Sequence, residues 1–259
     1  MMAYTYVYNE QDVIEESLAH MLDQGLSVYV LDNWSTDNTR QIVTEMTYRY
    51  PQRLYMERFP FDAAPRWFEL RPILDRIQAL HYQLDPGWGM VFGADELFEA
   101  PHGQSVAEFL EAVGQRGYTC VGSVQATFHP VDNAWAPGKS MKDHFKFWNH
   151  GQQQNNRAWK ARSFSFAAGG HDVSFVGKSV YPDGALILRH YPFRNQAQAE
   201  HKTFIDRKPR YSPDEVRIGW HTHMDSVKPG YNFIKAPEGL HAYRDPKSFY
   251  EELRCPPKS

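Results

Sequence analysis

Strands and helices alternate through the first hundred residues of this sequence, and that alternation leaves few folds open to the chain. Apolar runs with strand character lie at residues 3–8, 26–31, 53–57 and 90–92. Apolar residues at helical spacing separate these runs, at residues 12–23, around 42–46 and at 70–84. Alternation at this spacing is typical of βαβ units, which build a mainly parallel sheet with helices on both faces. We therefore predict an α/β fold of the α/β/α sandwich type.

The rhythm changes after Pro101. One further helix is predicted from Val106 to Val113, where Gly114 ends it. Short strand-like pieces follow near residues 118–128, 143–148, 159–166 and 185–189. Polar loops are predicted between them, including the glutamine- and asparagine-rich run Gln152–Asn156. Because the sequence contains neither an internal repeat nor a clean linker, we predict one domain.

The bulk composition argues against several classes of protein. The formal net charge of −3 at pH 7 provides no basic field for holding nucleic acid. Two cysteines, Cys120 and Cys255, cannot build a disulfide framework, so we expect a reducing compartment. The N-terminus lacks the basic region of a signal peptide, and no apolar run approaches the ~18 residues of a membrane span. We predict a cytoplasmic protein without a transmembrane segment.

Two of the predicted strands lead directly into acidic residues. The sequence YVLDNWSTDNT, residues 29–39, passes from an apolar strand into Asp32, and the fourth strand is soon followed by Asp95 and Glu96. In an open parallel sheet, the carboxyl ends of the strands border the ligand crevice. Since a carboxylate there costs desolvation, we interpret these acids as ligand-binding groups. Two alternatives stay open: Asp32 forms an Asx turn, and Asp37 caps the next helix.

At this point the residues resemble a known family. YNEQDVIEESLAHMLDQGLSVYVLDNWSTDNT, residues 8–39, resembles the amino-terminal signature of family 2-type glycosyltransferases, which have the GT-A fold. FGADELF, residues 92–98, is similar to their metal-binding segment, usually Asp-x-Asp-Glu. GGHDVSF and LRHYPFRNQAQAEHK, residues 169–175 and 188–202, are similar to carboxy-terminal segments of bacterial members, including the family 92 type. The resemblance covers roughly residues 3–210.

The resemblance implies a single GT-A-like domain over residues 1–259. Residues 1–100 would form a nucleotide-binding half and residues 101–236 an acceptor-binding half. The C-terminal tail, residues 237–259, is rich in Pro, Lys and Arg, and this composition predicts that it wraps around the domain or frays. The implied reaction moves a sugar from a nucleotide-sugar donor to a hydroxyl of a glycan or lipid-linked acceptor. It would be inverting and dependent on Mn²⁺ or Mg²⁺. Such an acceptor is compatible with peripheral association at the inner face of the membrane.

Position by position, the resemblance and the chemistry of the reaction assign residues to three roles. The donor is expected to contact Tyr8, Asn9, Glu10, Asp32, Asn33, Arg76, Gly93 and Lys202. The metal is expected to bind Asp95 and His190. The catalytic base is expected to be Asp172, with His171 as the second candidate, directly after the acceptor-loop glycines Gly169 and Gly170. Two positions match imperfectly: Arg76 only approximates the family's arginine, and Gly93 replaces the first acid of Asp-x-Asp.

A transfer of this kind requires a cation at the diphosphate leaving group and a base at the acceptor. One or two carboxylates plus phosphate oxygens hold Mg²⁺ or Mn²⁺, and a histidine nitrogen favours Mn²⁺. A positioned base contributes about 10²–10⁴ in rate. Lys202 or Arg194, which follow His190 in the sequence, could add positive charge near the phosphates.

Each assignment has a structural alternative that the sequence leaves open. His190 could be an ordinary buried histidine, and Asp172 could cap a turn after the glycines. Lys202 belongs to a polar helix in which most charges are expected to be solvated, and Glu96 could hold a neighbouring backbone amide. The segment His221-Thr222-His223 has no third ligand spaced to join it, so we assign it no role.

Other functional classes fit the sequence less well. The dinucleotide-binding glycine fingerprint, the Walker loop and the G-x-S-x-G elbow are absent from it. The rival functions are a catalytically inactive relative that binds a nucleotide-sugar or carbohydrate, suggested by Gly93, and a nucleotidyltransferase. A nucleotidyltransferase should have a basic phosphate-binding loop near the first strand, whereas residues 9–16 are acidic.

Overall fold

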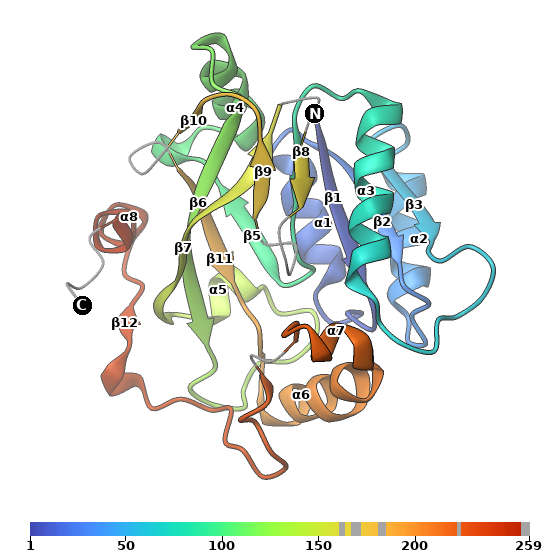
Figure 1. The fold of residues 1–259 in the computed structure, drawn as a ribbon. Coiled ribbons are helices and arrows are strands. Elements are labelled where there is room, and N and C mark those ends of the chain that lie inside the picture. Colours follow the sequence, from blue (N-terminus) through green and yellow to red (C-terminus); the bar gives the residue numbers. More distant parts are fainter. Residues whose placement is uncertain (161–163, 167–171, 181–184, 222–223, 255–259) are drawn as a thin grey trace.

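In the computed structural model, a ten-stranded mixed sheet forms the centre of the protein (Figure 1). The structure describes residues 1–160, 164–166, 172–180, 185–221 and 224–254. The strand order along the sheet is β3-β2-β1-β4-β7-β6-β11-β5, with β10 pairing to β6 and β12 to β7. A separate two-stranded sheet, β8–β9, packs against it.

The first half of the chain builds the parallel part of the sheet. Its elements are β1 (Met2–Val7), α1 (Ile14–Asp23), β2 (Ser27–Asp32), α2 (Thr39–Arg49), β3 (Leu54–Arg58), α3 (Leu70–Leu84) and β4 (Gly89–Val91). Strand β1 pairs in parallel with both β2 and β4, and β2 pairs in parallel with β3. Each element overlaps the segment predicted for it. The predicted α/β class is therefore confirmed.

The second half adds strands that run in both directions. Its elements are β5 (Glu96–Glu99), a 3₁₀ turn (Pro101–Gly103), α4 (Val106–Gln115), β6 (Cys120–His129), α5 (Met141–His144), β7 (Phe147–Trp159), β8 (Phe164–Phe166), β9 (Val173–Phe175), β10 (Ser179–Val180) and β11 (Leu186–His190). Strand β7 is antiparallel to β4 and β6, β6 is parallel to β11, and β11 is antiparallel to β5. The predicted parallel arrangement thus dominates the first half only.

The loop predicted at Gln152–Asn156 is wrong, because this run lies within β7. It pairs with β6, where Gly122 is the partner of Asn156 and Val124 that of Gln153. The register between the two strands shifts along this stretch. The polar composition of this run favours a loop. Pairing with β6 makes it a strand instead, and the hydrogen-bond ladder between the two strands is irregular.

Helices cover both faces of the first half of the sheet. Helices α1, α2 and α4 share a hydrophobic cluster with Ala3 and Val7 of β1. Helix α3 and the β8–β9 pair form another cluster with Met2 and Tyr4 of the same strand. Neighbouring side chains of a strand point to opposite faces, so β1 is buried from both sides. The strands therefore hold their carboxyl ends in a fixed frame.

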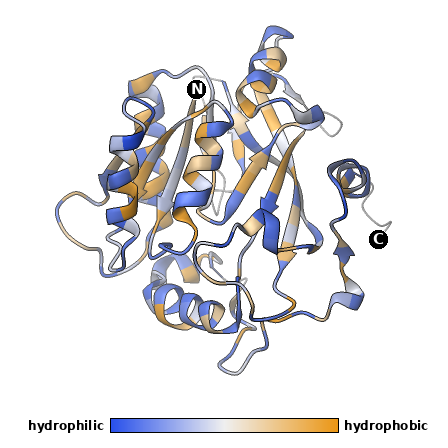
Figure 2. Ribbon diagram, turned by 180° about the vertical axis from the view of Figure 1, so that it is seen from behind, coloured by the Kyte–Doolittle hydropathy of each residue, from blue (hydrophilic) through white to orange (hydrophobic). Residues whose placement is uncertain are grey.

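After β11 the chain forms short helical elements before it returns to the sheet. They are α6 (Gln196–His201), a π-helical turn (Lys202–Arg207), a 3₁₀ turn (Lys208–Arg210), α7 (Pro213–Arg217) and a 3₁₀ turn (Pro237–Gly239). We call residues 196–217 the C-terminal helical segment. Its ribbon is coloured mostly hydrophilic in Figure 2. Among the described residues, no helix combines the length and the apolar character that crossing a bilayer requires.

The tail, predicted to wrap or fray, folds back onto the second half as far as Arg254. Strand β12 (His241–Ala242) pairs antiparallel with β7. Helix α8 (Pro246–Arg254) buries Phe249 and Leu253 in a cluster that includes Phe128 and Tyr191. Residues 255–259 lie outside the described part of the chain.

Candidate functional site

The carboxyl ends of β1, β2 and β4 lie at one edge of the sheet, because β1 pairs in parallel with both neighbours. Asp32 is the last residue of β2, and Asp95 lies in the turn between β4 and β5. The structure therefore agrees with the expectation that these two acids reach the same edge. The C-terminal helical segment crosses this edge, below the end of β1 in Figure 1.

A buried lysine joins two carboxylates at this edge. Lys202 Nζ lies 2.7 Å from Asp95 Oδ2 and 2.9 Å from Glu10 Oε1. All three side chains are buried. Removing charges from water costs free energy, which close opposite charges offset. The alternative in which Lys202 is solvated on a polar helix is therefore excluded.

Two arginines complete this group of charges. Arg194 Nη2 lies 3.0 Å from Glu10 Oε2 and 2.9 Å from Asp12 Oδ2, and its Nη1 lies 3.7 Å from Asp95 Oδ2. Arg207 Nη2 lies 3.1 Å from Glu10 Oε1. The Arg194 side chain is fully buried, whereas that of Arg207 is 45% exposed. We call the charged cluster the six residues Glu10, Asp12, Asp95, Arg194, Lys202 and Arg207.

The cations of the charged cluster control the ionisation of its carboxylates. Burial alone would raise the pKa of Asp95, but Lys202 and His190 hold that pKa well below its ordinary range. Burial likewise opposes ionisation of Glu10, yet Lys202 and Arg194 leave its pKa lowered. Burial, followed by the neighbouring arginines, lowers the pKa of the Lys202 ammonium. Glu10 and Asp95 are therefore ionised at neutral pH and able to bind cations.

His190 faces the other oxygen of Asp95. It ends β11, where it pairs with Glu96 of β5. Its Nε2 lies 3.7 Å from Asp95 Oδ1, and its Nδ1 lies 3.2 Å from the side-chain nitrogen of Gln125. The side chain is 26% exposed, so His190 is not the fully buried core histidine of the structural alternative.

Asp95 and His190 fit a divalent cation that takes its remaining ligands from a substrate. Magnesium in nucleotide sites is held by one or two carboxylates plus phosphate oxygens and water, and imidazole nitrogen suits the softer metals. Asp95 Oδ1 and His190 Nε2 would provide one oxygen and one nitrogen. Elsewhere in the described part of the chain, as here, no three His, Cys, Asp or Glu side chains gather into a metal site. Tight metal binding would therefore depend on further ligands from a bound substrate.

Glu96 has a structural task beside the metal candidates. Its Oε2 accepts a hydrogen bond from the Gly93 backbone N–H at 2.7 Å and pairs with the Arg157 guanidinium. The alternative in which Glu96 holds a backbone amide therefore agrees with the geometry. A Cβ atom at position 93 would stand 3.0 Å from Asp95 Oδ1. Glycine at this position thus leaves room for the Asp95 carboxylate as it is oriented here.

Asp32 is fully buried and has local partners for both oxygens. Its Oδ1 accepts from the Ser35 backbone N–H at 3.0 Å, and its Oδ2 lies 3.2 Å from Arg58 Nε. This is the turn-forming arrangement of the structural alternative. Asp37 likewise accepts from the Thr39 N–H, at 2.9 Å, at the start of α2. Recognition of a base or ribose by Asp32 stays a proposal.

The C-terminal helical segment also reaches Tyr8 and Asn33. The Arg210 guanidinium lies 3.4 Å from the centroid of the Tyr8 ring, and its Nη2 donates to Asn33 Oδ1 at 2.8 Å. Asn33 in turn donates to the Phe59 carbonyl at 3.0 Å. The Arg210 guanidinium is thus close enough to the Tyr8 ring for a cation–π interaction.

Asn9 adds a third connection between the two halves. Its backbone is left-handed, with φ of 53°, a conformation that asparagine tolerates better than most residues. Its Oδ1 accepts from the Thr36 N–H at 2.8 Å, and its Nδ2 donates to Asp206 Oδ1 at 2.8 Å. Asn9 therefore holds the loop after β2 and the C-terminal helical segment together.

Arg76 and Asp172 are held by partners outside the charged cluster. Arg76 of α3 makes two hydrogen bonds to Glu57 of β3, at 2.7 and 2.8 Å. Asp172 Oδ1 accepts from the Asn156 backbone N–H of β7 at 2.7 Å. This hydrogen bond agrees with a capping role, and the role of Asp172 as the catalytic base stays a prediction. The other base candidate, His171, and the glycines Gly169 and Gly170 lie outside the described residues.

Sequence reasoning missed Arg207, Arg210 and Asp12 as members or neighbours of the site. All three have polar or charged neighbours in the sequence, which resemble an ordinary solvated surface. The π-helical turn that brings Lys202 and Arg207 to one carboxylate has no sequence signal that we recognise. The only available clue was the abundance of basic residues at 202–210.

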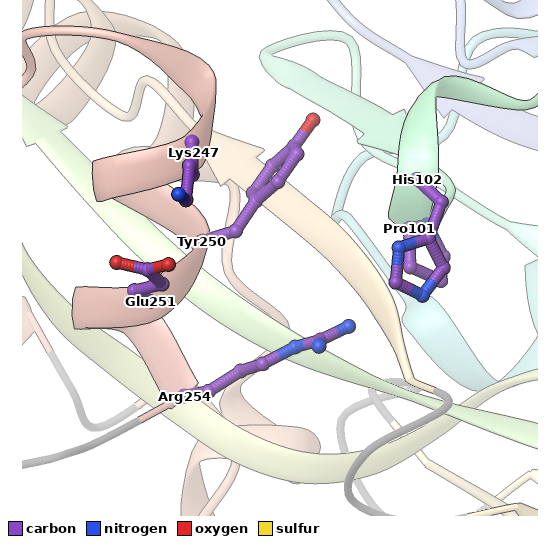
Figure 3. A pocket seen from close by; sticks show the side chains of 6 residues that line it. All are labelled: Pro101, His102, Lys247, Tyr250, Glu251 and Arg254. Carbon is purple, nitrogen blue, oxygen red and sulfur yellow. The ribbon is translucent and has the colours of Figure 1, made fainter.

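A separate pocket borders α8 and contains none of the predicted site residues (Figure 3). It has a volume of about 210 Å³ and is lined by Pro101, His102, Lys247, Tyr250, Glu251 and Arg254. The Tyr250 hydroxyl donates to Glu99 Oε2 at 3.0 Å, which ties the pocket wall to β5. Its lining residues include no group of buried opposite charges like the charged cluster, so we favour the cluster as the candidate site.

Comparison with known proteins supports the resemblance stated above. Residues 4–59 match the model of the family described as Glycosyl transferase family 2. The matched segment contains β1 to β3 with α1 and α2, and it includes Tyr8, Asn9, Glu10, Asp32 and Asn33. The expected resemblance to this family is thereby confirmed over that segment. No curated protein is similar enough in sequence to count as a match.

Two solved structures resemble the chain over part of its length. The mannosyltransferase PcManGT from Pyrobaculum calidifontis, in complex with GDP-Man and Mn²⁺, has 15% identity and a TM-score of 0.44, over 72% of this chain and 55% of that one. S. aureus TarS 1-349, in complex with UDP, has 17% identity and a TM-score of 0.33, over 54% of this chain and 38% of that one. The matched regions therefore span about half of the first protein and less of the second.

Proposed function

We propose that this protein is a glycosyltransferase that moves a sugar from a nucleotide-sugar donor to a hydroxyl of a glycan or lipid-linked acceptor. The observation that carries the proposal is the meeting of Asp95, His190 and Lys202 at the carboxyl ends of parallel strands. Such a group offers metal ligands and a fixed positive charge to one anion. The family match over residues 4–59 adds support, because it contains the proposed donor-binding residues of β1 and β2.

In the proposed mechanism, Asp95 and His190 would hold Mn²⁺ or Mg²⁺. When bound, such a metal neutralises the diphosphate as it leaves the sugar. Lys202 would add positive charge at the diphosphate once its contacts with Asp95 and Glu10 are exchanged for contacts with phosphate. Tyr8, Asn33 and Arg210 would enclose the nucleoside. Arg76, Gly93 and Asp32 are further proposed donor contacts.

An inverting displacement also needs a base that takes the proton of the acceptor hydroxyl. Asp172 is the proposed base, and its hydrogen bond to the Asn156 N–H would hold one carboxylate oxygen in place. His171 is the alternative base. A positioned base adds about 10²–10⁴ in rate, so the assignment predicts a large loss on its removal.

The test is incubation with UDP-, GDP-, dTDP- and CMP-sugars, each with EDTA and with Mn²⁺, followed by analysis of released nucleotide. We expect metal-stimulated release of a nucleoside diphosphate from one donor class, and faster release once the right acceptor is present. If the protein binds a nucleotide-sugar but releases nucleotide from none of them, the result would instead support the catalytically inactive relative. Release of pyrophosphate from a nucleoside triphosphate would support a nucleotidyltransferase. The cytoplasmic location and peripheral membrane association stay predictions.

A further inference from the structure

Glu10 stands at the centre of three cations. Its two oxygens lie 3.0 Å from Arg194, 2.9 Å from Lys202 and 3.1 Å from Arg207. The resemblance implies contact between Glu10 and the nucleotide base. The neighbours of Glu10 in the structure, however, are cations of the kind that bind phosphate. Guanidinium and ammonium groups around one oxyanion are the usual protein ligands of phosphate.

The π-helical turn explains how Lys202 and Arg207 reach the same carboxylate. In an α-helix, residues five apart point about 140° away from each other. In a π-helix the hydrogen bonds connect residues i and i+5, so residues five apart lie closer to the same side of the helix than they do in an α-helix. Lys202 and Arg207 are the first and last residues of this turn. The local backbone thus builds a two-cation face directed at Glu10.

The same segment contacts other proposed donor-binding residues. Lys202 also pairs with Asp95, Asp206 accepts from Asn9, and Arg210 contacts Tyr8. The C-terminal helical segment therefore contacts three of the residues that are expected to bind the donor or the metal, Tyr8, Asn9 and Asp95. A donor diphosphate can reach these cations only if their contacts with Glu10 and Asp95 are exchanged for contacts with phosphate.

We propose that the Glu10 carboxylate stands in for the donor diphosphate as the partner of Lys202, Arg207 and Arg194, and that the diphosphate replaces it when a donor binds. The inference deepens the proposed function, on which it rests for the nature of the ligand. It assigns Arg207 and Arg194 to diphosphate binding and Glu10 to competition with it. Glu10 would keep the cations buried and paired until a donor arrives.

The test is equilibrium calorimetry in EDTA, so that only side-chain cations hold the phosphates. The ligands are UDP, GDP and inorganic pyrophosphate, with uridine and guanosine as phosphate-free comparisons. Glu10→Gln keeps the size of the side chain and removes the competing charge. We expect it to bind pyrophosphate and the matching diphosphate at least about fivefold more tightly than the wild type, with nucleoside affinity unchanged. The matched control is Glu15→Gln, an exposed partner of Arg49, which should change neither.

Arg207→Gln tests the inference in the opposite direction, because it removes one of the cations. The Arg207 side chain is half-exposed. It should weaken diphosphate binding about tenfold and leave nucleoside binding unchanged. The exposed Arg49→Gln is its control. Because Glu10 and Arg207 are in contact, the double variant should differ from the sum of the single effects.

Several outcomes would overturn the inference. One is a Glu10→Gln variant whose affinity for pyrophosphate is unchanged or weaker than that of the wild type. Another is a Glu10→Gln variant that loses nucleoside and diphosphate affinity equally, which would place Glu10 at the nucleobase of the donor. If Glu10→Gln does not fold, an unchanged diphosphate affinity in Arg207→Gln decides against it. These readouts need no turnover. If the protein binds diphosphates in this way but transfers no sugar, only the proposed function is refuted. If the protein transfers sugar but Glu10→Gln leaves its diphosphate affinity unchanged, only the inference is refuted.

Discussion

At the scale of single residues, Asp95 is the position on which the proposed metal site depends. The sequence resemblance matches Asp95 to the second acid of Asp-x-Asp, and Gly93 offers no carboxylate beside it. Asp95→Asn should abolish the gain in nucleoside diphosphate affinity that Mn²⁺ provides, a loss of at least about tenfold or ~1.4 kcal/mol. His190→Ala should reduce the gain by a smaller amount. Calorimetry with and without Mn²⁺ measures both.

The matched control for Asp95 is Asp75→Asn, an exposed carboxylate that pairs with Arg71 on α3. It should leave the effect of Mn²⁺ intact. If Asp95→Asn responds to Mn²⁺ as the wild type does, Asp95 is only the structural partner of Lys202.

Asp172 is the residue on which the proposed base chemistry depends. Asp172→Asn retains the size of the side chain and an oxygen that can accept from the Asn156 N–H. We expect donor binding to persist and transfer to fall by at least about 10²-fold, as for other enzymes that lose a positioned base. A steady-state assay with saturating donor measures this. Normal turnover in Asp172→Asn together with an inactive His171→Ala would reverse the assignment.

At the scale of elements, a buried ion pair joins β5 to β11. Arg189 Nε of β11 lies 3.1 Å from Glu99 Oε2 of β5, and Lys142 of α5 pairs with the other oxygen. Tyr250 of α8 donates to Glu99 as well, at 3.0 Å. Burial would raise the pKa of Glu99, but Arg189 and Lys142 lower it from its ordinary 4.5 to about 2. Four elements thus share one ionised carboxylate.

This linkage predicts how stability responds to acid. Because the folded-state pKa of Glu99 lies below the unfolded one, its contribution is fully present above about pH 4.5 and is lost as the pH falls toward 2. Glu99→Gln should cost about 3–5 kcal/mol at pH 7, since it leaves Arg189 buried without its charge partner. The difference in unfolding free energy between variant and wild type should shrink between pH 4.5 and 2, as urea titrations can measure. A difference that is independent of pH would show that Glu99 acts through packing alone.

Prediction from sequence succeeded where a local pattern decides the element. Helix α3 coincides with the predicted residues 70–84 because its apolar stripe alone defines it. The cap of this helix, by contrast, is not local. The backbone N–H groups of Leu70 and Arg71 donate to Glu215 Oε1, at 2.8 and 3.1 Å. That partner lies 145 residues away in the sequence, so no local pattern could reveal it.

The same reasoning separates the predictable from the unpredictable part of the site. Acids at the ends of parallel strands are predictable, because topology alone brings them to one edge. The assembly of Lys202, Arg207 and Glu10 depends on a π-helical turn from the other end of the chain, and such turns lack a sequence signal. Strand β7 was likewise hidden, since its polar run becomes a strand only through pairing with β6.

At the scale of the whole molecule, strand β7 unites the two halves. It pairs with β4 of the first half and β6 of the second, and Trp159 at its end is fully buried. The charged cluster crosses the same division, since Glu10 and Asp95 come from the first hundred residues and their cations from the last seventy. The site therefore exists only when both halves are folded together, and the single-domain organisation stays a prediction.

The tail tests whether this unity extends to the C-terminus. Phe249 of α8 is 1% exposed and contacts the rings of Phe128 and Trp148, while the Arg189 guanidinium lies 4.4 Å from its centroid. Phe249→Ala should therefore destabilise the protein by about 3–5 kcal/mol, the usual cost of emptying a phenylalanine site in a core. Phe61→Ala, the same substitution at a side chain that is 58% exposed, should stay within about 0.5 kcal/mol of the wild type. Urea unfolding followed by tryptophan fluorescence measures both. If the tail merely frays, the two variants should have equal unfolding free energies. If the tail is integrated into the core, the whole chain including its first half should unfold in a single transition, and Phe249→Ala should lower the midpoint of that transition.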